Sequence, residues 1–171
     1  LQEMVDDGRV SSDNTEAIKV LDYLSTEGIS RIVRENGLQM NNFPDVRRMA
    51  CTILGQIGGE ESKDALVTVL LNDNEPMVRS EAVYALGQIG LNENNEVSRA
   101  IAWVILQQDT IAPDNNFAFA ALLAFDKLAQ QNNGIKDEEA YRAVIAIASG
   151  NYIRDVKYKA REVLNNLRSY Q

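Results

Sequence analysis

The chain has 171 residues, of which 45% are hydrophobic and 25% charged, and its formal net charge at pH 7 is −8. This length is ordinary for one domain, and the composition is normal for a helical protein with a core. The sequence contains no histidine, which excludes a Cys–His pair or a Ser–His–Asp triad. The negative charge argues against a protein that tracks phosphate backbones, because such a surface is basic.

Helical spacing of apolar residues recurs along the whole chain. Residues 1–7 look like the tail of a first helix whose beginning is missing, so we expect a piece of a longer protein. Between Val46 and Ile57 the apolar residues recur at i, i+3, i+4 and i+7, which predicts an amphipathic helix. Similar spacing predicts further helices over residues 15–24, 26–36, 62–72, 76–90, 96–108, 115–129, 137–148 and 154–167. We expect no strand, because alternation with a period of two is absent.

Two of these segments, 44–58 and 76–90, are close copies of each other. They share Pro, Val, Arg, Ala, Leu, Gly, Gln, Ile and Gly at equivalent positions. In both, proline precedes the expected helix and glycine follows it, as helix borders favour. Weaker copies occur in three other segments, and the alanines that align across all five are Ala17, Ala50, Ala82, Ala121 and Ala160.

A repeat of this length predicts a stacked array. Each copy follows another expected helix, so each unit is predicted to be an antiparallel helical hairpin, with units at roughly 1–24, 26–58, 60–90, 96–129 and 137–168. The sequence therefore predicts an all-α fold, an α-solenoid of about five hairpins that coil as a right-handed superhelix. We expect residues 1–171 to form one such domain.

The segment from Leu70 to Gly90, with its D-x-x-P-x-V-R-x-x-A-x-x-A-L-G-x-I-G pattern, resembles a HEAT repeat of the short bacterial type also called phycobilin-lyase-like. In that family an aspartate and an arginine bond along the array. The resemblance implies this structural ladder role for Asp73 and Arg79, and for Arg47 with Asn41 one unit earlier. Ala118 stands where the next arginine would be, so we expect the ladder to be interrupted there.

The resemblance also implies that the second helices line a concave surface. Their exposed stripe is then the expected partner-binding site: Arg48, Thr52, Gln56, Ser80, Tyr84, Gln88, Phe119, Leu123, Lys127, Tyr158 and Glu162. Aromatic and aliphatic side chains flanked by Arg48 and Lys127 are typical of a protein or peptide interface. An alternative is that Phe119 and Leu123 only fill the space between helices. For Trp103, among apolar neighbours on a first helix, we expect burial.

We therefore expect a non-enzymatic scaffold for a protein or peptide partner, with no cofactor and no metal. Cys51 is expected to be structural, since only Arg47 and Arg48 lie nearby to lower its pKa. The sequence has no apolar run that could span a membrane. Two alternatives stay open: a bilin lyase-type accessory subunit, which the resemblance implies, and nucleic-acid binding through the basic segment 154–168, which we consider the weaker one.

Overall fold

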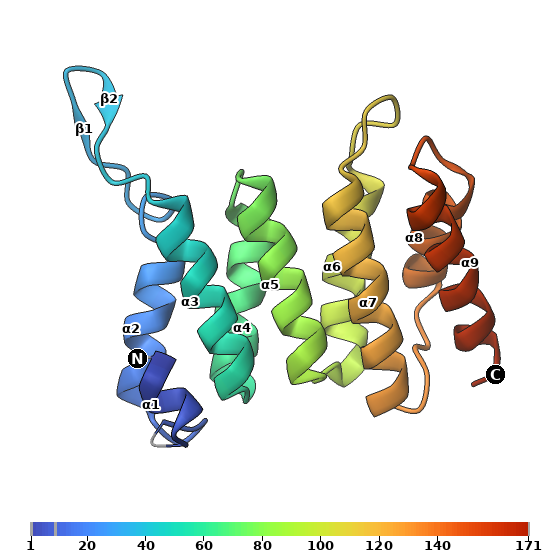
Figure 1. Ribbon diagram of the computed structural model, residues 1–171, viewed down its shortest axis with the longest axis horizontal. Helices are drawn as coiled ribbons and strands as arrows, with labels where there is room; N and C mark the ends of the chain where they lie inside the picture. The colour runs from blue at the N-terminus through green and yellow to red at the C-terminus, as the bar shows by residue number, and fades with distance from the viewer. Residues whose placement is uncertain (1, 9, 171) are drawn as a thin grey trace.

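The computed structural model describes residues 2–8 and 10–170, and helices account for most of them (Figure 1). Leu1, Arg9 and Gln171 lie outside the described residues. The helices are α1 (Gln2–Asp6), α2 (Thr15–Ser25), α3 (Pro44–Ile57), α4 (Glu60–Asn72), α5 (Pro76–Ile89), α6 (Glu96–Leu106), α7 (Asn115–Gln131), α8 (Glu138–Ser149) and α9 (Arg154–Arg168). A short 3-10 helix, η1 (Glu93–Asn95), precedes α6.

The helices stack side by side in two layers, as an α-solenoid does. The first layer consists of α2, α4, α6 and α8, and the second layer of α1, α3, α5, α7 and α9; each helix packs on its neighbour within its layer. Each first-layer helix also contacts the helix that follows it, and the connecting loops alternate between the upper and lower edges of the stack as drawn in Figure 1. The described residues thus form four hairpins, with α1 packed against α3 at one end.

The proline and glycine residues that border the repeats lie at the starts and ends of helices, as the sequence predicts. Pro44 and Pro76 occupy the first turns of α3 and α5, where a missing N–H costs nothing. Gly90 ends α5 in the left-handed conformation, with φ 77° and ψ 1°. The aligned alanines of α3, α5, α7 and α9 are all buried, whereas Ala17 in α2 is only half-buried. This difference reflects the layer in which α2 lies.

Two predictions about the N-terminal part are wrong. The sequence predicts residues 15–24 as a second helix, but α2 packs against both α3 and α4 and so belongs to the first layer. It is the hairpin partner of α3, and α1, expected to be a first helix, lies in the second layer. The described residues therefore contain four hairpins instead of the predicted five. The reason is that α2 occupies the first-layer position next to α3, which was expected for a helix at 26–36.

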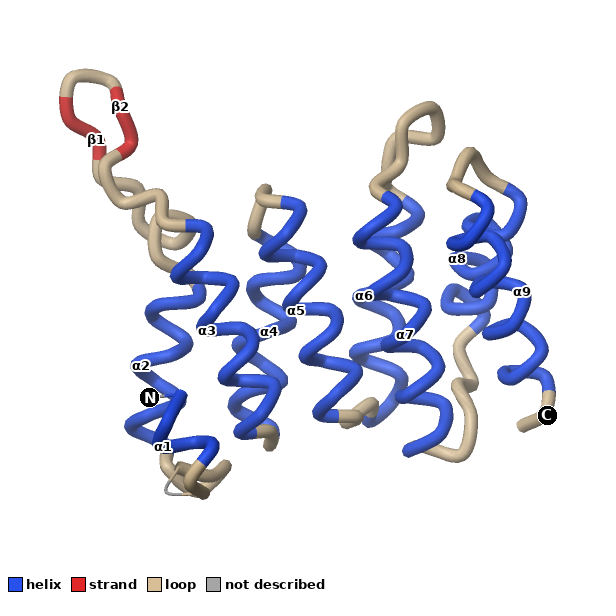
Figure 2. Tube along the Cα trace, viewed as in Figure 1, coloured by secondary structure: helices blue, strands red, loops and turns tan. Residues whose placement is uncertain are grey.

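Residues 26–43 form an arm instead of the predicted helix and contain the strands β1 (Arg34–Glu35) and β2 (Leu38–Gln39) (Figure 2). The strands pair antiparallel, with Glu35 opposite Leu38. Asn36 and Gly37 between them both have positive φ, of 50° and 82°. An Asn-Gly pair at a two-residue turn is a strong hairpin signal, which is the physical reason for the departure from a helix.

Asn41 fixes the base of this arm. Its buried side chain accepts a hydrogen bond from Val33 N and donates to the carbonyl oxygen of Arg31 and to Glu27. Asn41 is thus committed to the arm and does not pair with Arg47, as its expected ladder position would require.

Glycine allows the second-layer helices to approach closely. A Cβ atom at Gly55 would lie 2.7 Å from Ala85 Cβ, and one at Gly87 would lie 2.7 Å from Ala124 Cα. Contacts between carbon atoms are normally about 3.5–4.0 Å, so only glycine fits at these two crossings. The Leu-Gly-Gln-Ile sequence shared by both copies therefore sets the spacing of α3, α5 and α7.

Candidate functional site

The outward side of the second layer carries a groove made of two adjoining hollows. One hollow, of about 400 Å³, is lined by residues of α5, α7 and α9 and by Ile153; the other, of about 510 Å³, lies between α3 and α5. Tyr84 and Glu81 line both hollows. We call this surface the second-layer groove, and its main lining residues are Thr52, Gln56, Met77, Ser80, Glu81, Tyr84, Gln88, Phe119, Leu123 and Ile153.

Helical spacing explains why these side chains meet. Met77, Glu81, Tyr84 and Gln88 follow one another at intervals of four, three and four residues, so they share one face of α5. Phe119 and Leu123, four residues apart, do the same on α7. Because α5 packs against both α3 and α7, these faces form one continuous surface.

The apolar side chains of the groove are accessible to a partner. Tyr84 is 39% exposed and Phe119 is 40% exposed, while Met77 and Ile153 are exposed to a larger extent. The space between the helices is filled by Phe117 and Phe125, which are both buried. Phe119 therefore does not serve as a filler between helices, which was the alternative interpretation of its position.

Polar contacts hold the aromatic centre of the groove in place. Lys127 Nζ lies 5.3 Å from the centroid of the Tyr84 ring, within the range of a cation–π interaction. Thr52 Oγ1 donates a hydrogen bond of 2.8 Å to Glu81. Lys127 thus contacts the Tyr84 ring, and Thr52 positions the carboxylate of Glu81, which lines the same hollows as Tyr84.

The structure does not bring every predicted stripe residue into the groove. Arg48 and Tyr158 are exposed and line neither hollow, and Glu162 instead accepts a hydrogen bond of 2.8 Å from Lys159. Ser80 lines the groove, but it is buried rather than on the surface, and its hydroxyl donates a hydrogen bond to the Pro76 carbonyl.

Three groove residues were missed by the sequence-based reasoning: Met77, Glu81 and Ile153. Met77 lies one helical turn before Glu81, and the spacing from Tyr84 back to Met77 could have revealed it. Ile153 lies in the loop before α9, outside any helical stripe. It is positioned by a hydrogen bond of 2.9 Å from its backbone N–H to Asn115 Oδ1, which no sequence pattern indicates.

The ladder residues differ from one unit to the next. Arg47 forms a buried bidentate pair with Asp73, at 2.7 and 3.2 Å, which links α3 to the loop before α5. The Arg79 guanidinium instead lies 5.3 Å from the centroid of the Phe117 ring, and its Nε has no hydrogen-bond partner among the described residues. Burial lowers the pKa of Arg79, although the charge of Asp114 opposes this shift. Asp114 itself caps α7.

Cys51 is buried in α3, and this burial, together with the charges of Glu81 and Asp73, raises the pKa of its thiol to about 12. The thiol therefore stays protonated at neutral pH, and a protonated thiol is a poor nucleophile.

On the first-layer side, the expectation that Trp103 is buried is wrong. Its side chain is 53% exposed, because it points outward from α6 while Ile101, Ala102, Val104 and Ile105 fill the core. None of the helices in residues 2–8 and 10–170 has the length and apolar character needed to cross a membrane.

The comparison with known proteins agrees with the architecture. Residues 33–105 match the family model of HEAT repeats, a stretch that runs from the arm to α6. No curated protein matches the chain. The match and the two-layer stack together support a HEAT-like repeat protein.

Proposed function

We propose that this chain is a non-enzymatic scaffold that binds a protein or peptide segment in the second-layer groove. HEAT repeats generally mediate protein–protein interactions, and the groove supplies a specific surface for that role. The observation that carries the proposal is the cluster of exposed apolar residues Met77, Tyr84, Phe119 and Ile153, which lines one hollow and adjoins the second at Tyr84.

The groove has the composition of an interface centre with a polar border. Aromatic and methionine side chains are enriched at the centres of interfaces, and charged groups gather at their rims. Here Tyr84 and Phe119 supply aromatic surface, while Glu81 and Asp155 add carboxylates to the lining. We therefore expect the partner to insert an apolar side chain between Tyr84 and Phe119.

Preorganisation favours binding at this surface. The contact with Lys127 restricts the Tyr84 ring, so we expect less side-chain freedom to be lost when a partner covers it. Truncation of a central aromatic residue of an interface typically costs about 2 kcal/mol or more, which corresponds to roughly a thirtyfold weaker Kd.

The right-handed superhelical twist remains part of the proposal, with the groove on its concave side. The bilin-lyase role implied by the phycobilin-lyase-like resemblance is an alternative function. Tetrapyrrole absorbance in the purified protein would indicate it in place of peptide binding.

Peptides selected from a random library on the wild-type protein test the proposal, because the selection itself supplies ligands for the groove. The selected peptides are titrated calorimetrically against wild type, Tyr84→Ala and Phe119→Ala. Val20→Ala is the matched control, because Val20 is an exposed apolar residue, at 50%, in first-layer helix α2. We expect the groove substitutions to weaken binding about tenfold or more and the control to leave it unchanged. Selected peptides that bind all four proteins equally would refute the proposal.

A further inference from the structure

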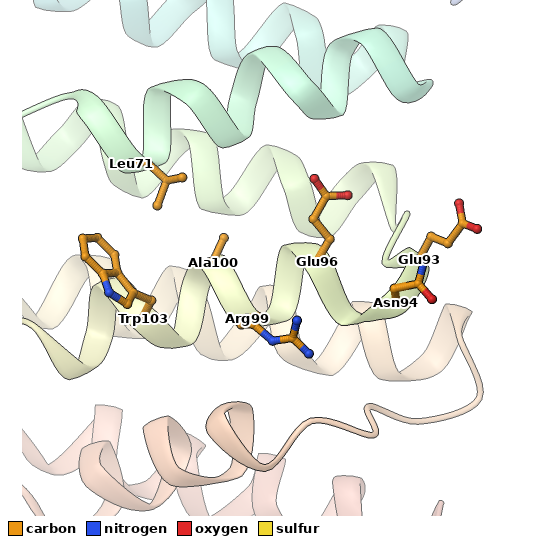
Figure 3. Close-up of a pocket in the computed structure, with 7 residues that line it drawn as sticks. All are labelled: Leu71, Glu93, Asn94, Glu96, Arg99, Ala100 and Trp103. Atoms are coloured by element: carbon orange, nitrogen blue, oxygen red, sulfur yellow. The ribbon is translucent and has the colours of Figure 1, made fainter.

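A separate hollow lies on the opposite side of the stack, where α4 and α6 of the first layer meet (Figure 3). Its volume is about 710 Å³. We call it the α4–α6 hollow. Its lining residues are Leu71, Glu93, Asn94, Glu96, Arg99, Ala100 and Trp103. None of them belongs to the second-layer groove.

One end of the α4–α6 hollow is apolar. Trp103 is 53% exposed and Leu71 is 44% exposed, and their side chains lie at the same end of the hollow, with the small side chain of Ala100 beside them (Figure 3). Tryptophan contributes more binding energy than most residues when a partner covers it. This end thus offers an aromatic anchor point at a concave surface.

The other end of the hollow is acidic. Glu93 and Glu96 lie there, and Glu96 accepts a hydrogen bond of 3.0 Å from Lys63. Lys63 Nζ also lies 2.8 Å from Glu60 and 3.0 Å from Asp64. Glu60 and Asp64 do not line the hollow, but through Lys63 they belong to the same charge cluster as Glu96. Together with Glu93, four carboxylates therefore lie at or beside this end with the single ammonium group of Lys63, which leaves an excess of negative charge. The remaining cation, Arg99, lies 3.5 Å from Asp137, so its charge is balanced elsewhere.

We propose that the α4–α6 hollow binds a basic segment of a partner protein. A lysine or arginine of that segment pairs with Glu93 and Glu96, and an apolar side chain of the same segment covers Trp103. Seven residues separate Glu96 from Trp103 along α6, a distance of about 10 Å at 1.5 Å per residue. A partner helix covers the same distance with side chains seven residues apart, which share one face because seven residues make about two helical turns.

Trp103 is the only tryptophan in the sequence, so its emission reports directly on this hollow. The probe is a designed amphipathic peptide with leucine and lysine side chains, and its matched controls carry glutamine or glutamate in place of every lysine. We expect the lysine peptide to shift the Trp103 emission to shorter wavelength, with an affinity that falls as salt is added. We expect the glutamine and glutamate peptides to bind more weakly.

Variants locate the binding site by anisotropy of the labelled lysine peptide. Trp103→Ala is expected to weaken binding about tenfold or more, and Glu93→Gln to weaken it and reduce its salt dependence. Tyr84→Ala and Glu35→Gln are the controls: the first lies in the second-layer groove and the second removes a carboxylate from the exposed arm. Both variants are expected to bind the lysine peptide as wild type does. These controls therefore distinguish failure of the α4–α6 hollow proposal from failure of the proposal for the second-layer groove.

Three results would overturn the inference. The first is equal binding of the lysine and glutamine peptides. The second is binding of the lysine peptide that neither changes the Trp103 emission nor depends on Trp103 or Glu93. The third is self-association in sedimentation equilibrium that Trp103→Ala abolishes while no peptide binds, because a second copy of the chain would then be the occupant.

Discussion

Gly87→Ala tests the close crossing of α5 and α7 on which the groove is built. The substitution adds one methyl group at a buried helical position, and that methyl group would lie 2.7 Å from Ala124 Cα and 3.0 Å from Ala124 Cβ. The nearest obstacle is a backbone atom, so no change of side-chain rotamer can relieve the clash. The two helices must move apart instead.

Two opposing effects set the magnitude. Alanine is favoured over glycine within a helix by about 1 kcal/mol, which would stabilise the variant. Extra volume in a close-packed core typically costs about 1–3 kcal/mol, and the cost falls at the upper end when backbone must shift. We therefore expect a net loss of about 1–2 kcal/mol, equivalent to a Tm lower by about 2–8 °C for a chain of this size.

Urea unfolding followed by circular dichroism measures the effect as a change in the midpoint. The control is Gln88→Ala, because Gln88 is the neighbouring residue and its side chain is exposed at the groove. We expect the control to change the stability by less than about 0.5 kcal/mol. A Gly87→Ala variant as stable as wild type, or more stable, would refute the close packing of these helices.

Three further predictions concern buried groups. Asp73→Asn leaves the Arg47 guanidinium buried without its partner charge and should cost about 3–5 kcal/mol in urea unfolding, whereas joint replacement of both residues by Leu and Met should recover part of this loss. Because burial raises the pKa of Cys51 to about 12, the stability due to its neutral thiol is complete below about pH 9 and is lost as pH rises towards 12. Unfolding curves from about pH 8 to 11 should therefore show wild type losing about 1.4 kcal/mol per pH unit above about pH 9 relative to Cys51→Ala, and parallel curves would contradict the burial of this thiol. Asn41→Ala should accelerate amide hydrogen exchange in residues 27–43 about tenfold or more and leave the exchange of α5 and α7 unchanged; faster exchange throughout would mean that the arm supports the stack.

The sequence was most informative where the repeat is strongest. The helices α3 to α9 follow from apolar spacing and from the proline and glycine borders, because burial of one helix face in a two-layer stack leaves a clear period. The same register placed Tyr84, Phe119 and Leu123 on one surface.

The failures have local physical causes. The apolar residues of 26–36 also suit a hairpin, and the Asn36–Gly37 turn decides in its favour. The layer of α2 could not be read from its apolar spacing, since helices of both layers bury similar faces. For Trp103, apolar neighbours indicated burial. However, the first-layer helix α6 has one face in solvent, and Trp103 lies on that face.

The central claim, that the second-layer groove holds a protein partner, is tested most directly by site-specific photo-crosslinking. A benzoylphenylalanine placed at Phe119 is compared with one at Val20, which is similarly exposed but lies in α2. We predict that position 119 crosslinks one protein from a native lysate, that position 20 does not, and that Tyr84→Ala abolishes the adduct. Identical crosslinking from both positions, or an adduct at position 119 that persists without Tyr84, would contradict the account.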